Sequence, residues 1–273
     1  MTQLFTHLLL ATEHSEYDTG AEAMGFALAQ RCQLPLTTVL PLVSNPEFEA
    51  IAPQIAAKAE QEAAVKIAEL RQQAQAVGVA IDLRLRRGQE PYQEIVDEAR
   101  QQGSDVVIIR RRGKRGLLAN LLVGEMVSKV VTHAPCHVLI VPREAQLWQQ
   151  RVLVAAEAGE SGRQVVATAI AVASECALPL NVVSVVGTEA QRPAADVFVA
   201  SVVKQASAQG LVAQGEVRVG KAYTEILSAS AACRADLIVM GSRGDASIGR
   251  ALIGGVAQKV MGLSELPVFV LHV

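Results

Sequence analysis

The sequence predicts an α/β protein with two similar domains in tandem, each an open five-stranded parallel sheet with helices on both faces. The chain repeats itself: residues 29–36 (AQRCQLPL) return as 173–180 (ASECALPL), and 105–109 (DVVII) return as 236–240 (DLIVM). A solenoid repeat runs to roughly 20–50 residues, so a repeat of this length indicates a duplicated domain. Within each copy, continuous apolar runs alternate with helical periodicity. That alternation favours parallel strands joined by right-handed crossovers.

The first strand of the first copy is predicted at 7–13, a nearly continuous apolar run that is typical of a strand buried on both faces. In the helix that follows, Ala21, Met24, Leu28 and Cys32 recur at helical spacing. The remaining strands are predicted at 35–42, 80–86, 105–110 and 137–142, and the remaining helices at 50–77, 91–102 and 120–133.

The second copy repeats this order, starting with a strand at 151–157. Val165, Ala169, Val172 and Cys176 give its first helix the same spacing. The remaining strands are predicted at 179–186, 215–219, 236–240 and 267–272, and the remaining helices at 193–209, 223–233 and 250–262.

We place the first domain at 1–142, a polar linker with the only tryptophan at 143–150, and the second domain at 151–273. The linker is too short to separate the halves widely. We therefore expect the two domains to pack on each other as an internal pseudo-dimer, and a homodimer of the whole chain is left open.

Composition narrows the classes of partner. Of 273 residues, 51% are apolar, which is enough for two cores, and the net charge of −2 gives no electrostatic case for binding nucleic acid or an anionic membrane. No apolar run approaches the ~20 residues that span a bilayer. The N-terminus lacks the charged region of a secretion signal. We expect a cytoplasmic protein.

Ligands of open α/β sheets bind at the carboxyl ends of the strands. After the fourth strand of the second copy, residues 241–255 read GSRGDASIGRALIGG. Such glycines let backbone N–H groups approach a phosphate, a helix N-terminus adds donors, and Arg243 adds charge. The alternative is that the glycines only turn the chain. Neither a Walker A pattern nor GxGxxG at the first strand-to-helix turns is present, which argues against those two nucleotide sites.

With this loop and the duplication, the chain resembles the universal stress protein family over both halves, almost end to end. Nucleotide-binding members of that family carry G-x2-G-x9-G-[S/T] after strand four. Residues 241–255 match the three glycines and both spacings, with Gly255 in place of the Ser or Thr. The stretches 133–141 (HAPCHVLIV) and 266–271 (LPVFVL) resemble the family's approach to its last strand. The resemblance implies Rossmann-like domains of the adenine nucleotide alpha hydrolase-like kind, often ATP-binding.

The resemblance also implies residue roles in the second domain. The family's acid at the end of strand one corresponds to Glu157, and its adenine-side Val to Val185. The phosphate-binding stretch corresponds to Gly241, Ser242, Arg243, Gly244, Gly254 and Gly255. ATP or ADP is the ligand so implied, and Mg²⁺ could accompany it. Loss of the hydroxyl at Gly255 removes a hydrogen bond worth roughly 0.5–1.5 kcal/mol.

The first domain departs further from the family pattern. Arg110 stands at the first glycine and Gly113 at the second, and ten residues (114–123) precede Gly124. Glu125 then replaces the Ser or Thr, and a carboxylate at a helix N-terminus repels a phosphate. We interpret this half as a degenerate site.

Other residues near that site leave alternatives open. Glu13 ends the first strand, His14 beside it could contact a ligand, and Pro41 falls near the adenine-side Val position. The basic run 110–115 is a solvated loop, a cluster in which Glu125 neutralises one arginine, or an anion or nucleic-acid site; without aromatic residues to stack bases, nucleic acid is the weaker alternative.

Three functions remain in competition. The leading hypothesis is a stress-response sensor or interaction module that binds an adenine nucleotide in its second domain. The second is an interaction module without nucleotide, and the third is a slow ATPase. Because the sequence contains no GxSxG elbow and no Cys/His spacing typical of zinc, no catalytic or metal-ligating residues are assigned.

Overall fold

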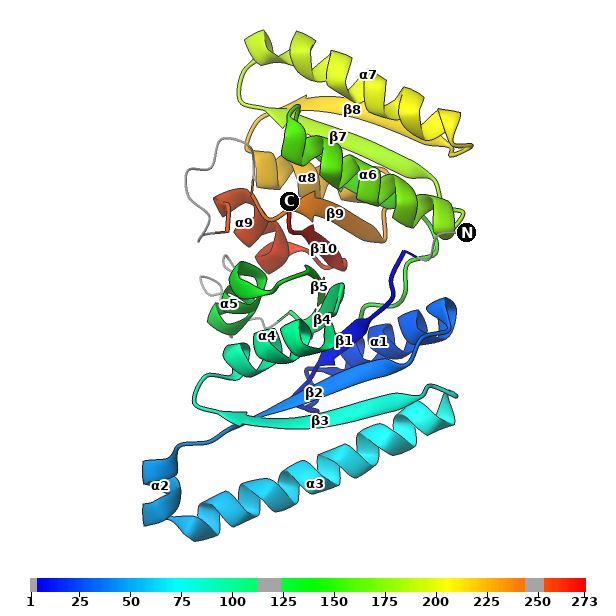
Figure 1. Ribbon diagram of the computed structural model, residues 1–273. Coiled ribbons are helices and arrows are strands. Elements are labelled where there is room, and N and C mark those ends of the chain that lie inside the picture. The colour runs from blue at the N-terminus through cyan, green and yellow to red at the C-terminus, as the bar shows by residue number, and fades with distance from the viewer. Residues whose placement is uncertain (1–3, 112–123, 244–252) are drawn as a thin grey trace. The chain divides into compact units, whose positions relative to one another are not determined.

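The computed structural model describes residues 4–111, 124–243 and 253–273 (Figure 1). They fall into two compact units, one comprising residues 4–111 with 125–147 and the other residues 148–243 with 253–273. Each unit is an α/β domain with one parallel sheet.

In the first unit the sheet order is β3-β2-β1-β4-β5, and every neighbouring pair is parallel. The chain leaves the centre for one edge and then returns to build the other, so β1 and β4 lie side by side. The elements are β1 (Leu8–Ala11), α1 (Thr19–Cys32), β2 (Leu36–Val43), α2 (Pro46–Ile51), α3 (Pro53–Ala76), β3 (Ile81–Gly88), α4 (Pro91–Gln102), β4 (Val106–Arg110), α5 (Glu125–His133) and β5 (His137–Val141).

The second unit has the same topology, with the order β10-β9-β6-β7-β8 and parallel pairs throughout. Its elements are β6 (Val152–Ala155), α6 (Glu160–Glu175), β7 (Leu180–Val186), the 3₁₀ helix η2 (Glu189–Gln191), α7 (Arg192–Ala208), β8 (Ala213–Val219), α8 (Ala222–Ala232), β9 (Leu237–Gly241), α9 (Gly255–Leu263) and β10 (Val268–Leu271). The fold class expected from the sequence is confirmed.

The core of each unit is its pair of central strands. Every residue of β1 and β4 is buried, as is every residue of β6. This is why these strands are continuous apolar runs rather than alternating ones. Helix α1 packs over β1 and β4, and α6 packs over β6 and β9, so the first helix of each unit lies against the gap between the two central strands.

One predicted helix is divided. The expected helix at 50–77 is two helices, α2 and α3, separated at Ala52. Pro53 explains the break, because proline disfavours helical geometry at the residue before it and starts helices well. Helix α3 has 24 residues against 17 in α7. Within the described part of the chain, no helix is both long and apolar enough to cross a membrane.

The amino ends of the strands are anchored alike in both units. The Asp236 carboxylate accepts hydrogen bonds from the backbone N–H groups of Gln149, Gln150 and Arg151 at 2.6, 2.8 and 2.9 Å. In the first unit, Asp105 accepts from the backbone N–H of Thr6 at 2.5 Å. Each carboxylate thereby fixes the segment that enters the first strand of its unit.

Candidate functional site

Strand register shows which residues of the two units are equivalent at the carboxyl ends. Ala11 of β1 pairs with Ile109, and Ala155 of β6 pairs with Met240. The residues that follow, Arg110 and Gly241, therefore hold the same position on the strand next to the first. The same comparison of β2 with β7 shows that Pro41 and Val185 hold equivalent positions in their units.

In the second unit, a cavity of about 180 Å³ lies at the carboxyl ends of β6, β7 and β9. Its inner wall is apolar and buried, formed by Val165, Val183, Ile226 and Met240. A dry apolar cavity of ~150 Å³ accepts benzene, so this one has room for an aromatic ring system.

Seven of the eight residues that the family resemblance assigned to the second domain line this cavity. They are Glu157, Val185, Gly241, Ser242, Arg243, Gly254 and Gly255. Gly244 lies outside the described residues. The structure adds Ser161 and Gly162, from the first turn of α6, which the sequence analysis did not assign.

Helix α9 begins at the cavity. Gly254 is its N-cap, and the backbone N–H of Gly254 donates to the carbonyl oxygen of Ser242 at 2.9 Å, while the Ser242 N–H donates to Leu271 at 3.0 Å. These bonds tie the two ends of the glycine loop to each other and its first end to β10. The first N–H groups of a helix have no intrahelical acceptor and carry the positive end of the dipole. The cavity thus combines an apolar wall with a site suited to an anion.

The Ser242 side chain adds a further donor. It is buried, and its hydroxyl has no hydrogen-bond partner among the described residues. A buried hydroxyl is usually satisfied by a protein group, water or ligand. Because Ser242 lines the cavity, its hydroxyl can bond to a bound molecule.

The glycines around the cavity are not equivalent. A Cβ at Gly162 would collide with the carbonyl oxygen of Glu157, so that position needs glycine. At Gly241 a Cβ would lie 3.0 Å from the Arg243 carbonyl oxygen and 3.3 Å from Val165 Cγ2, which is tight. At Gly255 nothing lies within 4 Å of a Cβ, so a larger residue fits there.

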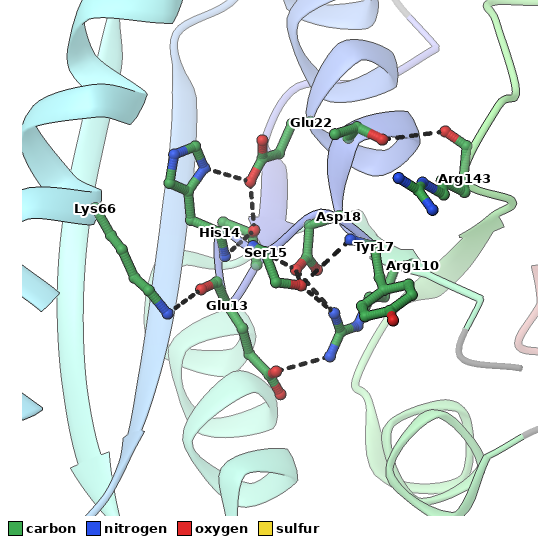
Figure 2. Close-up of polar contacts among 11 residues, drawn as sticks. Glu13, His14, Ser15, Tyr17, Asp18, Glu22, Lys66, Arg110 and Arg143 are labelled. Carbon is green, nitrogen blue, oxygen red and sulfur yellow. Dashed lines mark hydrogen bonds and ion pairs between the residues drawn. The ribbon is translucent and has the colours of Figure 1, made fainter. Parts of the chain in front are cut away.

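In the first unit, the Arg110 side chain lies at the corresponding position, among Glu13, Ser15 and Asp18 (Figure 2). This side chain is only 4% exposed. Its Nη1 donates to Ser15 Oγ at 2.7 Å and to Asp18 Oδ2 at 2.9 Å, and its Nη2 donates to Glu13 Oε2 at 2.7 Å. The guanidinium therefore bridges the end of β4 to the loop between β1 and α1.

Asp18 is the buried partner in this network, with a side chain only 1% exposed. Its Oδ2 also accepts from the backbone N–H and the hydroxyl of Ser15, at 2.9 and 2.5 Å. If the repeats are aligned with Glu13 on Glu157, Asp18 falls on Gly162. Helix α1 starts only at Thr19, whereas α6 starts at Glu160, so loop 13–18 in the first unit occupies a stretch that is partly helical in the second.

Two further contacts hold the same loop to α1 and α3. His14 Nδ1 lies 2.9 Å from Glu22 Oε1, and its Nε2 lies 3.2 Å from Glu69 Oε2. Lys66 Nζ donates to the Glu13 carbonyl oxygen at 2.9 Å (Figure 2). His14, considered above as a ligand contact, thus has both ring nitrogens against carboxylates.

Glu125 begins α5, as predicted, but its side chain is 79% exposed, and its Oε1 lies 3.1 Å from Lys129 Nζ. The hydrogen bond with Glu125, and to a smaller extent the one with Glu90, raises the pKa of Lys129. The carboxylates on Arg110 belong to Glu13 and Asp18, so the interpretation that Glu125 neutralises an arginine does not hold for Arg110.

The remaining assigned residues of the first domain contribute less. Gly124 is buried just before α5, and Gly113 lies outside the described residues, as do Arg112, Lys114 and Arg115. Within the part of the chain that is described, no group of three or more His, Cys, Asp or Glu residues is placed to hold a metal ion.

The sequence analysis missed Asp18 and Ser15. One signal could have found Asp18: alignment of the two repeats places this acid opposite a glycine, at the start of a helix, in the same half where Arg110 replaces a glycine. An acid and a base that both stand opposite glycines of the other repeat, near the carboxyl ends of neighbouring strands, indicate an ion pair.

Comparison with known proteins agrees with this architecture. A sequence profile of the universal stress protein family matches residues 4–142 and 149–272. The universal stress protein Slr1230 of Synechocystis is 26% identical over 164 residues, and Sll1388 of the same organism is 41% identical over 70 residues. These matches cover 60% and 26% of this chain and 56% and 44% of those proteins, so the chain spans about half the length of the curated relatives it matches.

Among solved structures, a universal stress protein from Archaeoglobus fulgidus aligns with a TM-score of 0.77 at 19% identity, over 98% of this chain and 96% of that one. A second, PA1789 from Pseudomonas aeruginosa, whose function is unknown, aligns with a TM-score of 0.68 at 19% identity, over 98% and 93%. At these identities the structures support the fold alone. Since the family profile matches both halves, the chain belongs to the universal stress protein family.

Proposed function

We propose that this protein acts in the stress response and binds an adenine nucleotide, ATP or ADP, in its second unit. The observation that carries the proposal is the cavity at the carboxyl ends of β6, β7 and β9, which opens beside the N-terminus of α9. Its apolar wall suits a purine ring. The backbone N–H groups of α9 and the Arg243 side chain suit phosphates.

A charge placed at the start of α9 tests this assignment. Gly255→Glu puts a carboxylate at the first residue of α9, the place that Glu125 holds in α5, and the open space there accepts the side chain. A charge at an exposed helix N-terminus is worth about 0.3–1 kcal/mol, so ATP affinity should fall about two- to fivefold in calorimetry. The matched control is Gly255→Gln, which has the same shape and no charge and should stay near the wild type.

Adenosine distinguishes the two parts of the site. Because it lacks phosphates, its affinity should be the same in Gly255→Glu and Gly255→Gln. Equal ATP affinity in both variants would show that phosphates do not lie at α9. Native mass spectrometry of the purified protein, searched for retained nucleotide and Mg²⁺, tests which ligand is carried.

If the wild type binds no nucleotide, the protein is an interaction module, the second function considered above. If it binds ATP, overnight incubation followed by nucleotide chromatography separates a sensor from a slow ATPase. In either case we expect a cytoplasmic protein whose two units associate as a pseudo-dimer. Cross-linking mass spectrometry of the full chain, with and without a lengthened linker, tests that association.

A further inference from the structure

We propose that Arg110 and Asp18 together exclude a ligand from the first unit, because their buried ion pair fills the cleft that is a cavity in the second unit. The inference rests on the proposed function, since it names the residues that confine nucleotide to the second unit. It assigns the exclusion to a side-chain pair inside the cleft instead of to Glu125 at the start of α5.

Position is the first argument. Arg110 and Gly241 share one place on equivalent strands, and Asp18 and Gly162 share one place in the aligned repeats. In the second unit both positions line the cavity. In the first, both carry buried charged side chains that contact each other at 2.9 Å. Two charged side chains in the first unit therefore stand at the positions of two glycines that line the cavity in the second.

Charge is the second argument. The Arg110 guanidinium faces two carboxylates, Asp18 and Glu13, so it offers no net positive charge to an incoming phosphate. Both terminal nitrogens are engaged: Nη1 has two acceptors and Nη2 has one, whereas the buried Nε has no hydrogen-bond partner among the described residues. A phosphate that approached Nη1 or Nη2 would have to displace a group that is already bonded, in most cases a carboxylate.

Restraint of the loop is the third argument. Loop 13–18 could admit a ligand only by moving away from β4. It is held to β4 by Arg110, to α1 through His14 and Glu22, and to α3 through Lys66. These anchors come from three different elements, so no single rotation of a side chain opens the cleft.

The experiment removes the pair together. In the full chain, Arg110→Gly with Asp18→Gly recreates the two glycines of the second unit. Calorimetry with ATP should give one site in the wild type and two in the double variant, while Glu125→Ser should keep one. A folded double variant that still has one site would overturn the proposal. With Gly255→Glu added, only the site in the second unit should weaken, so the site whose affinity is unchanged should be the new one.

A reverse experiment covers the case in which the double variant does not fold. Gly241→Arg places the same guanidinium in the second unit, with Glu157 available as Glu13 is to Arg110. ATP affinity should fall at least tenfold, whereas Gly241→Ala, which shares the Cβ contacts, should keep most of it. Unchanged affinity in Gly241→Arg would overturn the proposal.

Failure of the proposed function is a separate outcome. If the wild type binds no nucleotide, inorganic phosphate is titrated into the isotope-labelled double variant and wild type, followed by NMR. Shifts around β4 and α1 in the double variant alone would support the exclusion. Absence of shifts in both would overturn it.

Discussion

The two clefts of this chain are built on one backbone plan and hold opposite contents. At the carboxyl ends of β6 and β9, Gly162 and Gly241 line a cavity; at the ends of β1 and β4, Asp18 and Arg110 form a buried ion pair. If nucleotide binds only in the second unit, as proposed, the difference teaches how a duplicated domain can lose a site without losing its fold.

At the amino ends of the same strands, the two units are alike. Asp105 and Asp236 each accept a backbone hydrogen bond from the segment before the first strand of their unit and so anchor it. The architecture is therefore shared where it supports the sheet, and it diverges where a ligand would bind. The predictions below test this division, starting from the largest expected effect.

Removal of the buried carboxylate should have the largest effect. Asp18→Ala leaves Arg110 buried with only the partly exposed Glu13 as a charged partner, and breaking a buried pair in this way costs about 3–5 kcal/mol. Hydrogen exchange by mass spectrometry should show faster exchange in β1 and β4 and no change in β6 and β9.

The control is Glu13→Ala. The Glu13 side chain is 37% exposed, so its removal should cost less than about 1 kcal/mol. Similar exchange in the two variants would mean that burial does not rank these partners, and that the cleft is wetter than its geometry indicates.

Removal of the aspartate that anchors the first strand should have the second-largest effect. Asp236→Ala removes the acceptor of three backbone N–H groups, and hydrogen bonds to a charged group are worth about 1.5–3 kcal/mol. The buried Trp148 lies next to these groups, so its fluorescence can follow urea unfolding of the second unit. If the anchors are equivalent, Asp105→Ala should destabilise the first unit by a similar amount, measured by hydrogen exchange.

Much of this could be predicted from the sequence, because the signals are local. Apolar runs and helical spacing predicted each strand to within two residues at both ends, whereas the helix starts predicted at 120 and 250 lie outside the described residues. The break at Ala52 was missed, although Pro53 is a local signal that could have predicted it. The Asp18–Arg110 pair joins residues 92 positions apart, and no pattern within either segment specifies it.

The role of Glu125 illustrates the same limit. A carboxylate at the first residue of a helix is visible in the sequence, but the direction of its side chain is not. The structure turns it toward Lys129 and solvent. The sequence therefore predicted that Glu125 lies at the start of the helix, whereas the direction of its side chain depends on the folded structure.

Restoring the family hydroxyl in the second unit should give a smaller effect. Gly255→Ser fits without a clash and supplies one hydrogen bond, worth roughly 0.5–1.5 kcal/mol. ATP affinity in calorimetry should therefore rise about two- to tenfold. Gly255→Ala has no hydroxyl and should show no gain; an equal gain in both variants would point to helix stability as the cause.

Replacement of Glu125 should have the smallest effect on ATP affinity. In the wild type, Glu125→Ser should leave nucleotide binding unchanged, because the Arg110–Asp18 pair still fills the first cleft. In the background of Arg110→Gly with Asp18→Gly, the same change should strengthen ATP binding to the first unit, since an exposed charge at a helix N-terminus is worth about 0.3–1 kcal/mol, or about two- to fivefold in affinity. Calorimetry in both backgrounds makes the comparison. A second site that appears with Glu125→Ser alone would make Glu125, and not the buried pair, the residue that separates the two clefts.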